Sequence, residues 1–413
     1  MVSRAELIDD ATIVTGQTVL PGGWMVVTGG RIAEVGSASA RRPAADQMTS
    51  LRGAAVLPGF VDVHVHGGDG VSFGPDRQAS LRAARFHLAS GTTSLLAGIA
   101  SRPLDQLREC VTTVGSLPAE LDGGGRLLGI HLEGPFISPR RKGAHDLAVL
   151  RRPDPAELRD LIDAAPGRTR LLAAAPELPG FAAMAREAAA AGVVISAGHT
   201  DASGDELVAS VADGVQSLTH TFNGMRPSGH REPGPLQAVA DTEIYCEIIC
   251  DGIHVHPTFV RLLRRVAGAG RVVLITDAVA WAGLPEGEHR SADRRVEVRH
   301  GRVTLAGTDT LAGSTLTMSG AVRRYWEMTG ASLTELAAAS SGNAARLLGE
   351  ERHIARLATG YPADLVVLDA ARRCAGVMAA GRWVREPGAP RSATGQADPE
   401  ADAAGCACAG PSA

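Results

Sequence analysis

The sequence has few aromatic residues: Phe, Trp and Tyr make up only 3% of its 413 residues, although 45% are hydrophobic. A core must therefore be built mainly from Ala, Val, Leu and Ile, which favours layered α/β packing. The chain also lacks a large net charge, since 41 Lys and Arg face 45 Asp and Glu, for a formal charge of -4. This balance argues against general nucleic-acid binding and leaves basic recognition local, so we expect a small substrate.

Cysteine is too sparse for a disulfide framework. None of the six cysteines has a CxxC partner, so reduced thiols in a cytoplasmic protein are expected. No apolar stretch approaches the roughly 20 residues of a membrane span. The segment Met1 to Asp10 is polar and has no apolar h-region. We therefore expect neither export nor membrane anchoring.

What the chain does have is a repeated alternation of short apolar runs and Ala- and Leu-rich helical segments. We count eight candidate strands: Phe60 to Val65, Thr92 to Ala97, Leu127 to Leu132, Leu171 to Ala175, Val193 to Ala197, Gln216 to Thr219, Tyr245 to Cys250 and Val272 to Thr276. Helical patterns fall between most of them, for example at Ala79 to Ser90, Asp154 to Ala164, Phe181 to Ala191 and Pro257 to Ala267. Eight β/α units predict an α/β fold with a closed, TIM-like (β/α)8 barrel. A doubly wound sheet is the weaker alternative, because no GxGxxG follows the first strand.

Both chain ends carry short β-like runs between Gly-rich turns. The runs are Trp24 to Thr28, Arg31 to Val35, Ala54 to Leu57, Asp364 to Leu368 and Gly376 to Val384. We predict a small β-sandwich domain from residues 1–57 and 355–386, flanking a barrel domain of residues 58–354. Residues 387–413, which include Cys406 and Cys408, are rich in Pro, Gly, Ala and Ser, so we expect a disordered tail of unknown role.

Polar residues stand at the ends of the apolar runs, where a barrel would gather them at one rim. His64 and His66 alternate across Val65, so both imidazoles point to one face and can reach one ion. A pair of hydrogen-bonded barrel histidines is the alternative for an isolated HxH. The position at the end of the first run favours metal ligands.

Three more polar residues end later runs. Glu133 ends the third run, His199 the fifth and His220 the sixth. Two neutral imidazoles and a carboxylate are a typical open zinc set, with a fourth position left for water or substrate. Each residue alone would be interpreted as a cap or a core polar residue, but the ordered set predicts a metal site.

Asp277 follows the eighth run, so its carboxylate should emerge from a dry core into the same rim. A carboxylate beside a metal-bound water can take its proton and pass it to a leaving group. Asp is also common as a helix N-cap, which is the alternative interpretation. We expect the catalytic role.

These residues resemble a known family. Gly59 to Gly67 and Thr276 to Ala278 are similar to the amidohydrolase superfamily. Further stretches are similar to the N-acetylglucosamine-6-phosphate deacetylase family within it: His131 to Pro135, Lys142 to His145, Gly198 to Thr200, His220 to Met225, Arg231 to Gly234, Asp251 to His254 and Leu311 to Ser314. The resemblance runs from about Leu57 to Val384 with the motifs in the same order.

The resemblance implies a division of labour at the metal centre. Glu133, His199 and His220 would hold the principal divalent ion, and Asp277 would be the general base and acid. His64 and His66 would carry a second ion, so one or two ions are expected per subunit, with zinc favoured and iron, cobalt or manganese left open. No lysine ends the fourth run, where Ala173 to Pro176 stand, so a carbamylated lysine is not expected to bridge the two ions. Glu133 is the expected bridging ligand.

The resemblance also implies a phosphorylated amino sugar as substrate. Arg231 and His254 would bind the phosphate, and Asn223 and Gly224 would offer it backbone N–H groups. His145 would contact the sugar and the acetamide carbonyl and would stabilise the tetrahedral intermediate. A homodimer is expected, with Arg231 reaching into the neighbouring subunit, although a solvated surface charge is the alternative for Arg231. His256 is left out of the site, because it precedes Pro257 and should begin a helix.

The reaction predicted from this resemblance is hydrolysis of N-acetyl-D-glucosamine 6-phosphate to D-glucosamine 6-phosphate and acetate, by a metal-activated water with Asp277 as base and acid. It belongs to amino-sugar catabolism and recycling. The alternatives are an N-acetylgalactosamine-6-phosphate deacetylase or another amidohydrolase. A more distant alternative is a non-catalytic assembly protein on the same barrel, which would be expected to have lost metal ligands or the aspartate after strand eight. The identity of the metal and the configuration at C4 of the sugar stay open.

Overall fold

The apolar runs pair into one parallel sheet, in the order β15-β14-β13-β12-β11-β10-β9-β6. The structure is a computed structural model that describes residues 4–16, 18–290 and 295–388. The strands of this sheet are β6 (Phe60–Val65), β9 (Thr92–Ala100), β10 (Arg126–Glu133), β11 (Thr169–Ala174), β12 (Val194–Ala197), β13 (Val215–Leu218), β14 (Tyr245–Ile249) and β15 (Val272–Ile275). All eight predicted strands are present, and their observed ends differ from the predicted ones by up to three residues.

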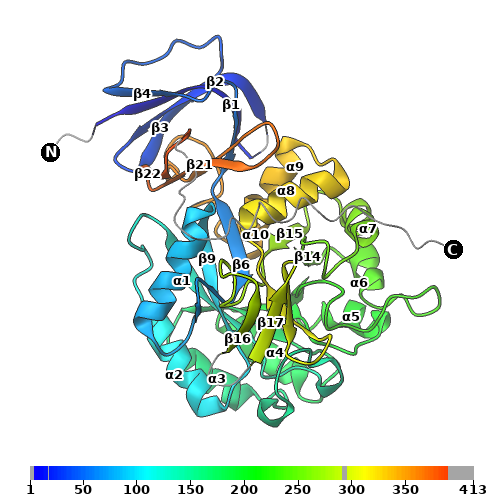
Figure 1. The fold of residues 1–413 in the computed structure, drawn as a ribbon. Helices are drawn as coiled ribbons and strands as arrows, with labels where there is room; N and C mark the ends of the chain where they lie inside the picture. The colour runs from blue at the N-terminus through cyan, green and yellow to red at the C-terminus, as the bar shows by residue number, and fades with distance from the viewer. Residues whose placement is uncertain (1–3, 17, 291–294, 389–413) are drawn as a thin grey trace.

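The first and last strands of this sheet meet, and their meeting closes the barrel. The backbone N–H of Asp277 donates to the carbonyl oxygen of His64 at 2.8 Å, and that of His66 donates to Ala278 at 2.8 Å. Figure 1 shows the strands in the centre with helices around them. The predicted TIM-like barrel is therefore confirmed.

The helices that follow the strands form the outer layer of the barrel. They are α1 (Arg77–Ala89), α2 (Leu104–Gly115), α3 (Pro155–Asp163), α4 (Phe181–Ala190), α5 (Gly204–Ser210), α6 (Pro235–Asp241), α7 (Pro257–Ala267) and α8 (Met318–Thr329). Three short helices follow α8: α9 (Leu333–Ala337), η3 (Ala338–Gly342) and α10 (Asn343–Leu347). Two single helical turns, η1 (Pro139–Arg141) and η2 (Leu147–Val149), lie in the loop between β10 and α3. None of the helices in the described ranges combines the length and the apolarity needed to cross a bilayer.

Local capping explains where several helices begin. The Asp76 and Asp154 carboxylates accept from the first backbone N–H groups of α1 and α3. Ser203 and Glu206 form a reciprocal capping box on α5. His256 caps α7, as predicted, by accepting from the N–H of Thr258 at 3.2 Å.

Strands from both chain ends form a second, mostly antiparallel sheet. Its order is β22-β21-β20-β5-β1-β2-β3, and β4 pairs with β1. The strands are β1 (Glu6–Val14), β2 (Val19–Thr28), β3 (Arg31–Gly36), β4 (Gln47–Ser50), β5 (Ala55–Pro58), β20 (Leu365–Leu368), β21 (Cys374–Ala379) and β22 (Arg382–Arg385). Pairing of β5 with β20 joins the two ends. This arrangement fits the predicted small sandwich domain, which lies above the barrel in Figure 1.

The domain boundaries stay a proposal: residues 1–57 and 355–386 for the small domain and 58–354 for the barrel. The first boundary lies between β5 and β6, at the point where the chain leaves one sheet for the other. Almost all of the predicted tail, residues 389–413, lies outside the described residues.

A third sheet was not predicted from the sequence. Strands β16 (Gly287–Arg290), β17 (Arg295–Arg299), β18 (Arg302–Leu305) and β19 (Leu311–Ser314) form an antiparallel sheet after the last barrel strand, and the short pair β7 (Gly67–Gly68) and β8 (Val71–Ser72) follows the first. Val296, Val298 and Val303 form its small buried core. The N–H of Ser314 donates to the carbonyl oxygen of Asp277 at 2.8 Å, which fastens this sheet to the rim of the barrel.

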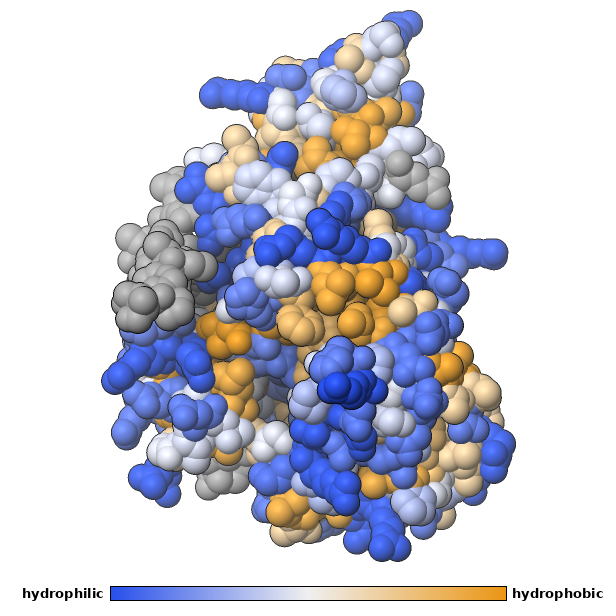
Figure 2. Space-filling view, turned by 90° about the vertical axis from the view of Figure 1, so that its right-hand side faces the viewer, coloured by the Kyte–Doolittle hydropathy of each residue, from blue (hydrophilic) through white to orange (hydrophobic). Residues whose placement is uncertain are grey.

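Hydrophilic side chains predominate on the face shown in Figure 2, and apolar side chains gather there in separate groups. Scattered apolar residues of this kind are normal on protein surfaces. No single continuous apolar patch covers this face.

The buried imidazole of His87 in α1 should make the fold sensitive to acid. Its Nε2 lies 2.8 Å from the carbonyl oxygen of Gly67. Burial lowers the pKa of His87 from 6.5 to about 4, and the bond to Gly67 offsets only part of this shift. The folded chain therefore binds this proton more weakly than the unfolded chain, so His87 alone should remove about 2 kcal/mol of stability between pH 7 and pH 5.

Urea unfolding of the wild type and His87→Gln at both pH values measures this contribution. The glutamine amide keeps a donor for Gly67 but does not titrate, so the variant should lose less stability on acidification. Equal losses in the two proteins would contradict the assignment.

Candidate active site and metal centre

The candidate residues lie at the carboxyl ends of the barrel strands. Glu133 is the last residue of β10, and His199, His220 and Asp277 each come two residues after the end of β12, β13 and β15. These three residues have left-handed backbones, with φ of 47°, 29° and 48°. Such conformations are strained for residues other than glycine and persist where the surrounding structure imposes them. The loops thus turn abruptly to aim three side chains at the barrel axis.

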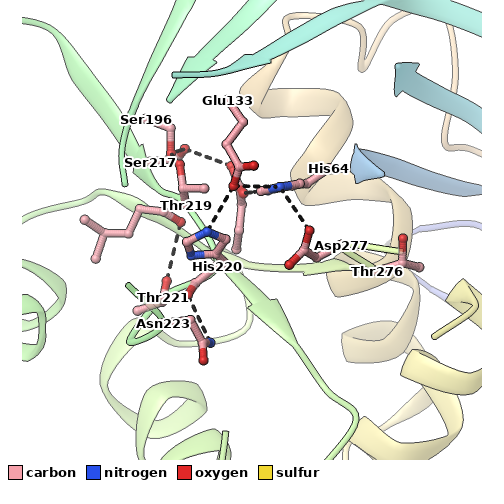
Figure 3. A network of polar contacts seen from close by, with 12 residues as sticks. His64, Glu133, Ser196, Ser217, Thr219, His220, Thr221, Asn223, Thr276 and Asp277 are labelled. Atoms are coloured by element: carbon pink, nitrogen blue, oxygen red, sulfur yellow. Dashed lines mark hydrogen bonds and ion pairs between the residues drawn. The ribbon is translucent and has the colours of Figure 1, made fainter. Parts of the chain in front are cut away.

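One carboxylate oxygen of Glu133 faces two imidazoles. Its Oε1 lies 3.3 Å from Nε2 of His199 and 3.2 Å from Nε2 of His220, and the two nitrogens are 3.1 Å apart. Nδ1 of His199 lies 2.7 Å from the carbonyl oxygen of Arg141 and donates to it, so the Nε2 lone pair is left for a ligand bond. Three ligand atoms this close, with one tautomer fixed from behind, fit a divalent ion such as zinc. Figure 3 shows Glu133 and His220 pointing toward each other.

A second group of ligand atoms adjoins the first. Nε2 of His64 and Nε2 of His66 are 3.1 Å apart. They lie 3.3 Å from Oε1 and Oε2 of Glu133, respectively, and 3.5 and 3.4 Å from Oδ1 of Asp277. Figure 3 shows His64 between the two carboxylates. Glu133 therefore faces both groups, as a bridging ligand would.

The two carboxylates of the centre are ionised. Burial raises the pKa of Glu133, but its contacts with the imidazoles of His145, His199 and their neighbours bring it well below its usual value. Burial likewise raises the pKa of Asp277, and the bond to His66 brings it below its usual value. Asp277 caps no helix, because the next element along the chain is β16. A buried, ionised carboxylate beside the ligand groups can accept a proton.

A cavity of about 610 Å³ opens above these groups. It is lined by most of the predicted site residues: His66, Glu133, His145, His199, His220, Asn223, Gly224, His254 and Asp277. His64 lies beneath it and is fully buried (0% exposed). Nε2 of His145 lies 3.3 Å from Oε2 of Glu133, so this imidazole reaches the centre itself.

His254 supplies a cation to the cavity. Its Nδ1 lies 2.6 Å from Oδ2 of Asp251, which follows β14. Burial lowers the pKa of His254, but the pairing with Asp251 more than offsets this effect, so the net pKa is raised. A charged imidazole fixed by a carboxylate suits an anionic substrate group.

One predicted donor is already engaged. The backbone N–H of Asn223 donates to the carbonyl oxygen of His220 at 2.9 Å, so the expected contact of this N–H with a phosphate stays a prediction. The Asn223 side-chain amide donates to the same oxygen at 3.2 Å, and both bonds tighten the turn after β13. Gly224 follows with φ of 56°, and a Cβ there would meet Nδ1 of His199 at 2.8 Å. A glycine is therefore required for the turn to pass this close to His199.

The structure does not bring Arg231 to the other site residues within one chain. Arg231 is exposed, in the loop between β13 and α6, and it is absent from the cavity lining. The prediction that it serves a neighbouring subunit is untested by a single chain.

The sequence reasoning missed several residues in the cavity wall and behind it. Arg102, Trp281 and Asp309 line the cavity and lie in loops that carry no pattern. Glu247 lies inside β14 and faces the barrel interior beside His64. A single glutamate within an apolar strand was the signal that could have revealed it.

Eight parallel strands with this His, Glu and Asp set at the rim define a metal-dependent hydrolase on a (β/α)8 barrel. The amidohydrolase family pattern matches residues 55–384 of the chain. The chain belongs to the amidohydrolase family and is a hydrolase. The family is metal-dependent, and the described residues provide candidate ligand groups, although they do not identify the metal.

Individual relatives are similar over nearly the whole chain. N-acetylglucosamine-6-phosphate deacetylase from Bacillus subtilis (strain 168) is 33% identical over 372 residues, covering 89% of this chain and 94% of the relative. N-acetylgalactosamine-6-phosphate deacetylase from Escherichia coli O157:H7 is 34% identical over 349 residues, covering 84% and 92%. The solved structure of a variant N-acetyl-D-glucosamine-6-phosphate deacetylase from Mycobacterium smegmatis, in complex with N-acetyl-D-glucosamine-6-phosphate, is 37% identical, with a TM-score of 0.87. That alignment covers 94% of this chain and 100% of that one.

Proposed function

We propose that this chain hydrolyses the acetamide of N-acetyl-D-glucosamine 6-phosphate to D-glucosamine 6-phosphate and acetate. The observation that carries the proposal is the convergence of two imidazoles on Glu133, with Asp277 across the same cavity. The M. smegmatis relative binds this sugar phosphate, and the relative from B. subtilis has the corresponding name. The reaction would serve amino-sugar catabolism and recycling.

Glu133, His199 and His220 would hold the principal ion, and His64 and His66 a second one. When bound, the metal polarises the acetamide carbonyl and lowers the pKa of a coordinated water. Zinc suits these ligands best, although iron, cobalt and manganese are accepted by the same donors. Glu133 would bridge the two positions, since its two oxygens face different imidazoles.

Asp277 would act as the general base and then as the general acid. Its carboxylate would accept the proton of the attacking water and then donate it to the departing nitrogen, because an unprotonated amine is a poor leaving group. His145 would donate to the oxygen of the tetrahedral intermediate from the cavity wall. One side chain can act as base and then as acid because the attacking oxygen and the departing nitrogen are bonded to the same carbon.

The phosphate would bind beside His254 in the wall of the cavity. His254, paired with Asp251, would supply positive charge within the chain, and Asn223 and Gly224 line the same cavity. Arg231 would complete the clamp from a neighbouring subunit, which makes a homodimer the proposed functional unit. Within one chain Arg231 is exposed, so its side chain is accessible to a neighbouring subunit.

Arg231→Ala should separate phosphate binding from catalysis. Loss of a phosphate clamp should raise KM for N-acetylglucosamine 6-phosphate by on the order of 10- to 100-fold, since a charge-assisted contact contributes about 1.5 to 3 kcal/mol. The KM for unphosphorylated N-acetylglucosamine should rise far less. Steady-state kinetics on both sugars measures the difference, and equal effects would refute the clamp.

A second candidate substrate is N-acetylgalactosamine 6-phosphate, which is favoured by the E. coli relative of that name. The two sugars differ only in the configuration at C4.

Acetate release from both 6-phosphates, and from an N-acetyl amino acid, tests the proposed function. We expect the gluco sugar phosphate to have the highest kcat/KM, and a preference for the amino acid would contradict the proposal.

We also propose a cytoplasmic location. Among the described residues, Cys110, Cys246 and Cys250 are buried cysteines that form no disulfide. Unpaired thiols are typical of a reducing compartment.

A further inference from the structure

A buried carboxylate lies directly behind the metal centre. Glu247 is the middle residue of β14 (Tyr245–Ile249), and its side chain is 0% exposed. Its Oε2 lies 3.2 Å from Nδ1 of His64, on the side of the imidazole opposite the candidate ion position. Nothing in the proposed mechanism uses this residue.

The polar surroundings of Glu247 contain little to compensate its charge. Among the described residues, its hydrogen-bond partners are His64 and Ser217, whose Oγ lies 3.3 Å from Oε1. The same Ser217 hydroxyl lies 2.7 Å from Oγ of Ser196, and Thr219 donates to Ser196 at 2.6 Å. Figure 3 shows these three hydroxyls gathered beside the centre. One hydroxyl proton serves one acceptor at a time, so His64 is the main counterpart of this carboxylate.

Burying a carboxylate in a barrel is costly unless a cation is near. The cost falls if positive charge resides on the far nitrogen of His64. Nε2 of His64 faces Glu133 at 3.3 Å, His66 at 3.1 Å and Asp277 at 3.5 Å. An ion at that nitrogen would place its charge across one imidazole from Glu247.

Glu247 also decides which nitrogen of His64 is free. A carboxylate accepts and cannot donate, so a neutral His64 must carry its proton on Nδ1 and present the Nε2 lone pair to the centre. The ring of His131 packs edge-on against His64 at 4.4 Å between centroids, but neither nitrogen of His131 has a hydrogen-bond partner among the described residues. Packing from His131 therefore restrains the ring of His64 without fixing its tautomer.

The two halves of the centre differ in how their histidines are supported. His199 donates from Nδ1 to a neutral acceptor, the carbonyl oxygen of Arg141, at 2.7 Å. His64 instead faces the carboxylate of Glu247. A carboxylate behind an imidazole makes it a stronger donor to a metal than a carbonyl does. The stronger support therefore belongs to the half of the centre formed by His64 and His66.

We propose that Glu247 is a positioning residue that fixes the tautomer of His64 and supplies the charge needed for a second ion at His64 and His66. The inference rests on the proposed metal-dependent function and adds that the two-ion form is the working form. Glu247 is not among the residues that line the cavity and it contacts His64, so it would act through His64.

The test is a metal titration of the whole protein with two variants of Glu247. Protein stripped with a chelator is titrated with Zn²⁺ against a competing dye, and with Co²⁺ followed by its absorption spectrum. Glu247→Ala removes both the acceptor and the charge, whereas Glu247→Gln keeps an acceptor for Nδ1 and removes only the charge. Glu206→Gln, which alters a capping box on α5 and lies outside the cavity lining, is the control. Thermal unfolding shows which variants are folded, and the near-isosteric Gln variant keeps the test open if the Ala variant is not.

The wild type and Glu206→Gln should take up two ions. Glu247→Ala should bind the second ion about 10- to 100-fold more weakly, as other supporters of metal ligands do, while the first ion stays tight. The affinity of Glu247→Gln for the second ion should lie between those of the wild type and Glu247→Ala. The absorption spectrum of the second equivalent of Co²⁺ should change in both variants. Unchanged second-ion affinity in both variants would overturn the proposal.

The titration also separates this inference from the proposed function. A wild type that releases acetate with a single ion would overturn the inference and leave the function standing. A wild type that binds no ion and releases no acetate would contradict the proposed function, and the inference with it.

Discussion

Replacing Asp277 with Asn is expected to lower turnover by about 100- to 10,000-fold, the usual contribution of a general acid and base. Asparagine has nearly the same shape but cannot take the proton of the attacking water or return it to the amine. The carboxylate lies 3.4 Å from His66 at the edge of the ligand groups, so the principal ion should still bind. Acetate release under saturating substrate, with metal content measured on the same sample, checks both parts.

Asp309→Asn is the matched control for Asp277→Asn. Asp309 also lines the cavity, so this change removes one negative charge from the same space. It should cost much less turnover, because Asp309 makes no ion pair with the imidazoles of the centre in the described structure. Near-normal turnover in Asp277→Asn would refute the assigned role.

Glu133→Gln is expected to cause the second large loss of turnover, because it weakens metal binding and not because it removes a proton acceptor. Its two oxygens face His199 and His220 on one side and His66 on the other, so the change weakens both candidate ion positions. Metal affinity should fall by at least about 100-fold, because even residues that only support a ligand contribute 10- to 100-fold. Turnover should fall with it. Equilibrium dialysis against Zn²⁺ and acetate release measure the two effects.

Glu335→Gln is the control for Glu133→Gln, since Glu335 belongs to a capping box on α9 away from the centre. It should keep both metal and turnover. A Glu133→Gln protein with normal metal content would show that this carboxylate is not a ligand.

Much of the fold could be predicted because burial imposes a simple pattern on the chain. Barrel strands are covered on both sides, so they appear as continuous apolar runs, and Val272–Ile275 is one of them. The rim residues could be predicted for the same reason: His199, His220 and Asp277 interrupt the apolar pattern where a strand ends.

The remainder of the structure depends on contacts between distant segments. The sheet β16 to β19 is an exception: valines alternate with charged residues in Arg295–Arg299, a strand pattern that our prediction did not use. The bond from the Asn223 N–H to His220 depends on a turn geometry that residue types do not specify. Glu247 matters only because β14 places it behind His64, a residue 183 positions away. Sequence patterns indicate which face of a strand is buried, but they do not indicate which residue it will meet.

Metal-dependent acetate release tests the central claim most directly. The protein is stripped with a chelator, assayed on N-acetylglucosamine 6-phosphate, reloaded with Zn²⁺ and assayed again. We predict that release stops when the metal is removed and returns on reloading, in step with the ions bound. Full acetate release from protein that contains no metal would contradict the account.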